Sequence, residues 1–218
     1  MKHARVPYGQ SLTGDESTVL PEFDVPPADP LPLFREWIEA AERAGVREPL
    51  AAALATADVN GRVSSRIVLL KSVDEGGVVF TSAAIGRKAR DLEQNPYAAL
   101  TLYWRETMQQ LKLSGPVERC SAQESDAFFA ERPRPAQIAS IVARSSEPMD
   151  AVEGEAALAR ETDRLLAGIN PLPRPADWWG YRVIPHEIEF WQGRSNRLHR
   201  RLAYTLGAAG WTHERLQP

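Results

Sequence analysis

The chain has 218 residues, of which 43% are hydrophobic, and its formal net charge is −3. This length can bury one substantial core, and the charge balance excludes a nucleic-acid surface spread over a whole face. A single cysteine excludes an intrachain disulfide framework, and four scattered histidines disfavour a metal site. No stretch approaches the roughly 20 apolar residues that span a bilayer, so we expect a cytoplasmic protein without a membrane segment.

The first part of the chain predicts an arm, a helix and a strand meander. Residues 1–29 are rich in proline and poor in apolar groups, which indicates an N-terminal arm that is mobile or packs on a partner subunit. Apolar residues with helical spacing begin at Leu33 and stop at Gly45, as in an amphipathic helix. Strands are expected over 51–57, 63–70 and 78–82, joined by Asn60-Gly61 and Gly76-Gly77 turns.

The remainder predicts a second hairpin, a block of helices and further strands. A short helix over 87–93 precedes strands over 97–104 and 109–118. Helical spacing returns over 122–131, 136–143 and 151–166, and strands follow over 181–184, 187–192, 197–205 and 211–216. Hairpin-linked strands with helices in blocks predict an α+β fold. We expect one antiparallel β-barrel domain over residues 30–218, with helices packed outside it.

Cations cluster near the C-terminus. If a strand begins at Arg197, its two-residue period places Arg197, His199 and Arg201 on one face, with Trp191 nearby as a flat apolar wall. A row of cations favours a bound carboxylate or phosphate, with which arginine forms bidentate hydrogen bonds. Flanked by arginines, the imidazolium of His199 is disfavoured, which favours a neutral histidine that exchanges a proton near pH 7. A structural histidine is the alternative.

Other segments carry charge or buried amides. Residues 66–71 form an apolar run with Arg66 and Lys71 at its ends, typical of a strand buried on both faces, and a core strand with solvated ends is the simpler interpretation. Arg87 and Lys88 open a predicted helix, where free backbone N–H groups favour an anion, although a solvated basic patch is equally compatible. Gln110 has the chemistry to hydrogen-bond a heteroaromatic ring, although solvation at an edge strand is the default interpretation. The chain has no dinucleotide, Walker, serine-hydrolase or H-E-x-x-H motif.

Five ordered motifs resemble the pyridoxamine 5'-phosphate oxidase family, whose members are FMN-dependent split-barrel proteins. The motifs lie at residues 66–71, 86–89, 132–138, 190–193 and 197–199. The resemblance implies a homodimer with FMN at the subunit interface. The FMN contacts that it implies are Arg66, Ile67, Val68, Leu69, Leu70, Lys71, Thr81, Ser82, Arg87, Lys88, Gln110, Ser145, Ser146, Trp191 and Arg201. The implied substrate contacts are Lys71, Phe128, Arg132, Ala136, Arg197, Leu198 and His199, with Arg197 and His199 as the catalytic residues.

Three positions depart from the vitamin-phosphate oxidases of the family. Those enzymes hold the phosphate with a tyrosine and a serine where this chain has Phe128 and Ala136, and Ser145 replaces a glutamine at an FMN contact. Hydrogen bonds to charged groups are worth roughly 1.5 to 3 kcal/mol, so losing two hydroxyls is costly for a buried phosphate.

The chain resembles the phenazine-biosynthesis branch of the family more closely. This likeness lies at residues 11–14, 26–31, 45–49 and 103–107. It implies an FMN-dependent oxidase that dehydrogenates a partially reduced (tetrahydro or dihydro) phenazine carboxylate and passes the electrons to O2, giving H2O2. One alternative is a pyridoxamine or pyridoxine 5'-phosphate oxidase. A flavin-binding module without catalytic turnover is the second.

Overall fold

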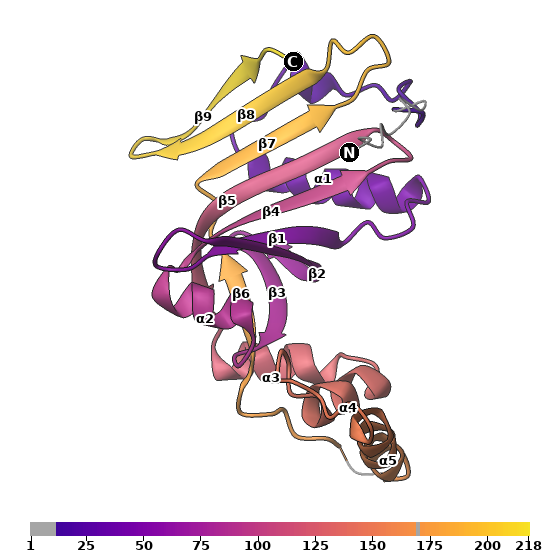
Figure 1. Cartoon of the computed structure of the whole chain (residues 1–218). Coiled ribbons are helices and arrows are strands. Elements are labelled where there is room, and N and C mark those ends of the chain that lie inside the picture. Colours follow the sequence, from indigo (N-terminus) through magenta and orange to yellow (C-terminus); the bar gives the residue numbers. More distant parts are fainter. Residues whose placement is uncertain (1–11, 169–170) are drawn as a thin grey trace, which may run out of the picture. The chain divides into compact units, whose positions relative to one another are not determined.

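The computed structural model describes residues 12–168 and 171–218. Strands in this part of the chain form a sheet in the order β4-β1-β2-β3-β6-β5-β7-β8-β9, and β4 also pairs with β5. Six of the strands, from β4 through β5 in that order, therefore close into an antiparallel barrel, with helices outside it (Figure 1). The predicted α+β barrel is confirmed.

The observed elements follow the predicted ones closely. The strands are β1 (Ala51–Ala57), β2 (Val63–Asp74), β3 (Gly77–Ala83), β4 (Tyr97–Trp104), β5 (Gln109–Arg119), β6 (Trp178–Val183), β7 (Glu187–Gln192), β8 (Arg200–Gly207) and β9 (Gly210–Leu216). The helices are η1 (Pro21–Phe23, 3-10), α1 (Pro30–Arg43), α2 (Arg87–Gln94), α3 (Ala122–Ala130), α4 (Arg134–Val142) and α5 (Gly154–Leu166). Among the described residues, no helix has the length and apolar character needed to cross a membrane.

The described chain divides into two compact units. Unit 1 comprises residues 12–52, 100–113 and 186–218, and unit 2 comprises residues 53–99, 114–168 and 171–185. The division runs through the predicted 30–218 domain, because β1, β4 and β5 each contribute residues to both units.

Unit 1 is built on α1. The side chain of Asp29 caps this helix by accepting a hydrogen bond from the Leu31 N–H at 3.0 Å, and Pro30 occupies the first turn, where no N–H is needed. The apolar stripe of α1 is buried, and the Trp37 ring meets that of Phe190 edge to face at 5.1 Å. Burying each such aromatic ring contributes about 2 to 3 kcal/mol.

Part of the predicted N-terminal arm lies against unit 1. Phe23 is buried, and the hydroxyl of Tyr204 donates to the carbonyl of Pro27 at 2.9 Å. The indole N–H of Trp37 donates to Glu22, so η1 is joined to α1. Residues 1–11 of the predicted arm lie outside the described part of the chain.

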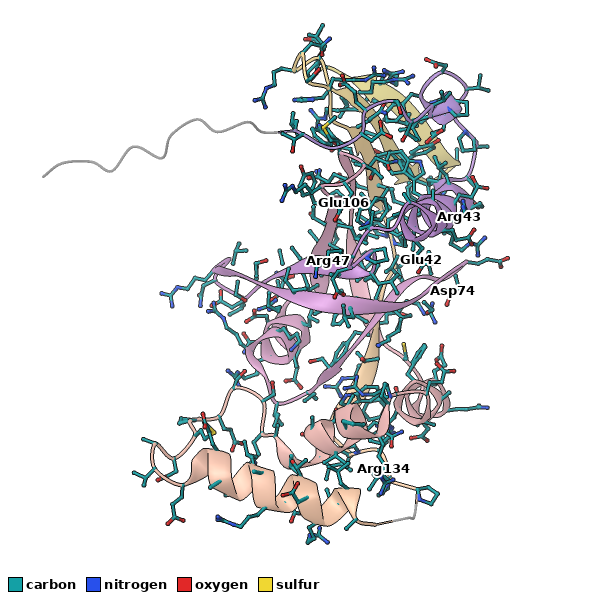
Figure 2. The ribbon with its side chains drawn as sticks, turned by 90° about the vertical axis from the view of Figure 1, so that its right-hand side faces the viewer. Glu42, Arg43, Arg47, Asp74, Glu106 and Arg134 are labelled. Carbon is teal, nitrogen blue, oxygen red and sulfur yellow. The ribbon has the colours of Figure 1, made fainter. Side chains whose placement is uncertain are left out.

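Unit 2 contains the helices between β5 and β6. The ring of Phe80 in β3 stacks on Tyr181 in β6 at 5.5 Å, and Arg182 pairs with Asp74 across the same unit. Arg134, at the start of α4, donates to the carbonyls of Leu165 and Gly168 at the end of α5 (Figure 2). These bonds join the two helices that flank residues 143–153.

Two local predictions were wrong. The strand expected from Arg197 begins only at Arg200, because Arg197 has a left-handed backbone (φ 68°) and Asn196 Oδ1 accepts the Leu198 N–H, so residues 195–199 turn. The strand expected to be buried on both faces is buried on one. Ile67 and Leu69 are 67% and 49% exposed, since no other described element covers that face of β2.

Candidate active site

An anion cradle in unit 2 forms where α2 begins. Gly86 is the N-cap of α2, so the first N–H groups of the helix have no intrahelical acceptors. A Cβ placed on Gly86 would lie 3.3 Å from Ser145 Oγ, 3.5 Å from Ser146 Oγ and 3.9 Å from Lys88 Nζ. Two hydroxyls, an ammonium group and a helix N-terminus therefore converge on one point, which is a suitable arrangement for a phosphate.

The charge of Lys88 is held at an electrostatic cost in this cradle. Burial lowers the pKa of Lys88, and the positive charge of Arg66 lowers it further. Ser146 adopts a left-handed backbone (φ 68°), a conformation that is costly for a residue with a side chain and that persists where the surroundings impose it. A bound anion would reverse the electrostatic cost at Lys88 and give the Ser146 hydroxyl a partner.

Asp91, a buried carboxylate on α2, fixes Arg66. Its Oδ2 atom accepts hydrogen bonds from Thr56 Oγ1 at 2.7 Å and Ser64 Oγ at 2.8 Å, and it lies 3.9 Å from Arg66 Nη2 and 4.0 Å from Arg87 Nε. Arg66 Nη1 also donates to Thr56 Oγ1 at 2.8 Å. Burial raises the pKa of Asp91, but these hydrogen bonds and the charges of Arg87 and Arg66 outweigh it and hold the pKa below its usual value. Arg66 is therefore held in place before any ligand arrives.

The predicted contacts on β2 and β3 divide between two faces. Arg66, Val68 and Leu70 lie on the more buried face of β2, whereas Ile67, Leu69 and Lys71 are exposed. Thr81 is half-buried and Ser82 is buried, in β3. Because the faces alternate, a ligand on one face of this strand would meet alternate side chains and the backbone.

A second cluster in unit 2 surrounds Arg132. Its guanidinium lies 5.2 Å from the centre of the Trp178 ring, and Nη2 donates to the carbonyl of Ala136 at 3.1 Å. The Nε atom of Arg132 is buried without a hydrogen-bond partner. Burial lowers the pKa of the Lys71 ammonium, and the positive charge of Arg132 lowers it further, so the two cations lie within electrostatic reach. Phe128 is half-buried in the same unit.

In unit 1, one sheet face carries an aromatic ring and several charged side chains. Trp191 in β7 is the register partner of Arg201 in β8, and Arg201 Nε donates to Glu189 Oε1 at 2.7 Å. Lys112 Nζ lies 3.4 Å from Glu189 Oε2, so β5 presents Lys112 to the same face. Gln110 is two residues from Lys112 and shares that face. The structure therefore brings together the predicted residues Gln110, Trp191 and Arg201.

The turn between β7 and β8 carries the predicted substrate residues. The Arg194 N–H donates to His199 Nδ1 at 3.1 Å, and the imidazole lies 4.8 Å from the Trp191 ring. Burial lowers the pKa of His199, and the charge of Arg197 lowers it further, which favours the neutral imidazole. Arg197 and Leu198 are exposed on this turn. Arg197 and His199 therefore share a turn instead of a strand face.

Several residues that shape these clusters were absent from the sequence-based prediction. Asp91 follows Arg87 by four residues on a helix, and this spacing could have indicated an ion pair. Glu189 lies two residues before Trp191 in β7, and this spacing places both side chains on one face of the strand. Trp178, which packs on Arg132, had no such local signal, because the contact joins segments far apart in sequence.

Two parts of the chain match known protein families. Residues 38–164 match the family described as "Pyridoxamine 5'-phosphate oxidase", and residues 178–218 match the "Pyridoxine 5'-phosphate oxidase C-terminal dimerisation region". The first match contains the anion cradle and, of the Arg132 cluster, Lys71, Phe128, Arg132 and Ala136. The second contains Trp178, Trp191, the turn and β8.

Relatives under two names resemble the chain over nearly its whole length. The pyridoxine/pyridoxamine 5'-phosphate oxidase of Rubrobacter xylanophilus is 49% identical over 190 residues, which cover 87% of each chain. The dihydrophenazinedicarboxylate synthase of Pseudomonas chlororaphis is 42% identical over 209 residues, which cover 96% of this chain and 93% of the relative.

A solved structure gives the same assignment. The crystal structure of PhzG from Burkholderia lata, in complex with tetrahydrophenazine-1-carboxylic acid, superposes with a TM-score of 0.89 at 40% identity, covering 94% of this chain and all of the other. The chain therefore belongs to the pyridoxamine 5'-phosphate oxidase family of FMN-dependent oxidoreductases.

Proposed function

We propose that this protein dehydrogenates a partially reduced phenazine carboxylate with FMN as cofactor and O2 as the final acceptor. The substrate loses two electrons and two protons and gains aromaticity, and O2 takes up both to give H2O2. Because aromatisation favours the reaction, the protein mainly has to position the substrate. The observation that carries this proposal is the Arg132 cluster, where the guanidinium lies over the Trp178 ring and its buried Nε–H has no acceptor.

The residues of unit 2 fit the phosphate of FMN. The point at which Gly86, the serine hydroxyls and Lys88 converge offers donors of the kind that a phosphate requires, and Arg66 is held nearby by Asp91. Lys88, Arg66, Ser145 and Ser146 would bind that phosphate, with Arg87 beside it. Residues 66–71, Thr81 and Ser82 would line the cofactor, and Gln110, Trp191 and Arg201 would contact its ring or tail. When bound, FMN supplies the two-electron redox chemistry.

The Arg132 cluster suits a flat carboxylate better than a phosphate ester. Phe128 and Ala136 lack the hydroxyls that a buried phosphate monoester would use, and Arg132 lies against Trp178 with a buried N–H that has no acceptor. A carboxylate needs fewer donors than a phosphate, and a tricyclic ring gains from aromatic contact. Lys71 and Arg132 would bind one end of the substrate. We assign Arg197 to a substrate charge and Leu198 to an apolar contact.

The hydrogen bonding of His199 defines what it can do. Because Nδ1 accepts the Arg194 N–H, the neutral imidazole carries its proton on Nε2. That Nε2–H is a donor, so His199 would orient the substrate by donating a hydrogen bond to a carboxylate or ring nitrogen. In this tautomer Nε2 cannot accept a proton, which favours orientation over base catalysis.

We also propose that the protein is a homodimer with FMN at the subunit interface. The outward face of β2 carries Val63, Ile67 and Leu69, all exposed, and Tyr97 of β4 is exposed in the same unit. Exposed apolar faces of this kind mark interaction surfaces. Residues 178–218 match a dimerisation region, and a second copy of the chain would cover such a face.

A paired oxygen-consumption assay tests the function. The FMN-loaded protein is given a dihydro- or tetrahydrophenazine carboxylate in one reaction and pyridoxamine 5'-phosphate in the other, and H2O2 is measured in both. We expect at least tenfold higher kcat/KM with the phenazine substrate. Peroxide release with pyridoxamine 5'-phosphate and none with the phenazine substrates would reject the proposal.

Vitamin-phosphate oxidation is the second candidate function. The Rubrobacter relative carries that name at 49% identity, and Lys71 and Arg132 remain available for a phosphate. The same paired assay decides between the two functions, because each predicts turnover of a different substrate. Failure to bind FMN at all would reject both.

A further inference from the structure

The N-terminal segment contacts the turn that carries Arg197 and His199. Both carboxylate oxygens of Glu16 accept hydrogen bonds from Ser195: Oε2 from the backbone N–H at 2.9 Å and Oε1 from the hydroxyl at 3.0 Å. These residues are 179 positions apart in sequence and belong to the same unit. We infer that Glu16 is a positioning residue, which holds the 194–199 turn in the conformation that presents Arg197 and His199 to the substrate.

Glu16 itself is held by its neighbours on both sides. The Asp15 N–H donates to the carbonyl of Glu106 at 2.8 Å, at the turn between β4 and β5 (Figure 2). Gly14 packs so closely there that a Cβ would lie 2.1 Å from the carbonyl oxygen of Arg105, which only glycine permits. On the other side, the Gln192 side chain donates to the carbonyl of Thr18 at 3.2 Å. The segment is therefore anchored on unit 1 before and after Glu16.

The turn needs such an external restraint. Arg197 has a left-handed backbone, which costs free energy for a residue other than glycine and is maintained only by surrounding contacts. Within the turn, Arg197 N–H donates to the Arg194 carbonyl at 3.0 Å, and the Arg194 N–H selects the His199 tautomer. Ser195 lies between these bonds. Holding Ser195 from outside therefore maintains both the Arg197 backbone and the Nε2–H tautomer of His199.

The positioning role of Glu16 deepens the proposed function, and its effect on catalysis rests on that function. The experiment therefore includes a measurement that needs no substrate. Nitrogen-15 histidine NMR of the FMN-loaded protein reports which ring nitrogen of His199 carries the proton, and the signal is assigned by its absence in His199→Gln. Glu16→Ala, Glu16→Gln and the control Asp15→Asn are compared with the unmodified protein. Asp15 is a suitable control because its side chain accepts from Ser17 within its own segment.

We expect Glu16→Ala to populate both neutral tautomers of His199 and to lower kcat/KM for the phenazine substrate about tenfold. FMN affinity should stay within about twofold, because the anion cradle lies in unit 2. Glu16→Gln should retain the tautomer and most activity, since a carboxamide can accept the Ser195 N–H and donate to its hydroxyl. Asp15→Asn should resemble the unmodified protein in both measurements.

Ser195→Ala provides a second route to the same conclusion. It removes one of the two bonds to Glu16, and combining it with Glu16→Ala should add no further loss. The inference is overturned if Glu16→Ala leaves the His199 spectrum equal to that of Asp15→Asn, or if the two substitutions act additively. If the tautomer shifts as expected but no phenazine substrate is oxidised, the positioning role stands and the proposed function fails.

Discussion

Replacing Gly86 with alanine should weaken FMN binding at least about tenfold without unfolding the protein. Gly86 has φ −79° and ψ 168°, which alanine adopts freely, so the substitution introduces no backbone strain. The added methyl group would lie 3.3 and 3.5 Å from the hydroxyl oxygens of Ser145 and Ser146. It therefore fills the space in which a phosphate oxygen would meet those hydroxyls and the N-terminus of α2.

The magnitude follows from the bonds that the methyl group blocks. One hydrogen bond to a charged group is worth roughly 1.5 to 3 kcal/mol, which corresponds to a Kd about 10- to 150-fold higher. The assay titrates FMN into the apoprotein and follows quenching of flavin fluorescence. Gly207→Ala is the matched control, because a Cβ there meets only the Gly210 carbonyl oxygen at an ordinary 3.9 Å.

Melting temperatures of the apoproteins separate binding from stability. We expect Gly86→Ala and Gly207→Ala to melt within a few degrees of the unmodified protein. A Kd for Gly86→Ala within twofold of the unmodified value, with melting unchanged, would refute the assignment of the phosphate to this cradle. A second substitution, Lys88→Ala, should weaken FMN binding by a similar factor, because it removes the nearest ammonium group.

Three further predictions concern substrate, protonation and stability. Phe128→Tyr with Ala136→Ser restores two hydroxyls and should raise kcat/KM for pyridoxamine 5'-phosphate at least about tenfold, measured as peroxide release; no gain would exclude these positions as the cause of selectivity. Arg197→Asn removes the charge but tolerates the left-handed backbone, so NMR titration should show a raised pKa of His199, with turnover lowered and flavin content unchanged. Because the pKa of His199 is lower in the folded chain than its usual 6.5, its contribution favours folding above pH 6.5 and diminishes as the pH falls through that value. Asp91→Ala leaves the hydroxyls of Thr56 and Ser64 without their acceptor and Arg66 without its ion-pair partner, and it should lower the free energy of unfolding by about 2 to 3 kcal/mol in urea titrations; a loss below about 0.5 kcal/mol would contradict the network.

Sequence periodicity predicted the regular elements because their signals are local. The α1 stripe from Leu33 and the strand Ala51–Ala57 both repeat with the period of their structure, and both were found in the predicted places. The wrong start of β8 has a local cause too. Asn196 forms a turn through its side chain, and alternation between charged and apolar residues concealed that turn. The side-chain hydrogen bond of Asn196 therefore determined the local structure here, and the two-residue strand pattern did not.

The candidate site was predictable only in part. Arg66 and Lys88 carry charges in motifs, so a family resemblance indicated them without a structure. The sequence could not indicate that Asp91 fixes Arg66, or that Glu16 contacts Ser195, because these contacts join residues distant in sequence. The exposed face of β2 was also missed, since an apolar strand has the same composition whether its second face is covered by the chain itself or by another copy.

We propose that the cofactor contacts and the substrate contacts differ in organisation, which would explain why relatives of similar identity carry two names. The cofactor half is preorganised: Asp91, Thr56 and Ser64 hold Arg66 through several bonds, so most changes there would be costly. We expect the substrate contacts to depend on few positions, because exchanging hydroxyl-bearing residues for Phe128 and Ala136 would alter the ligand without disturbing the cradle. Relatives under both names can therefore share 42 to 49% identity with one chain. We therefore expect the substrate of this chain to be decided by positions 128 and 136 and by the 194–199 turn.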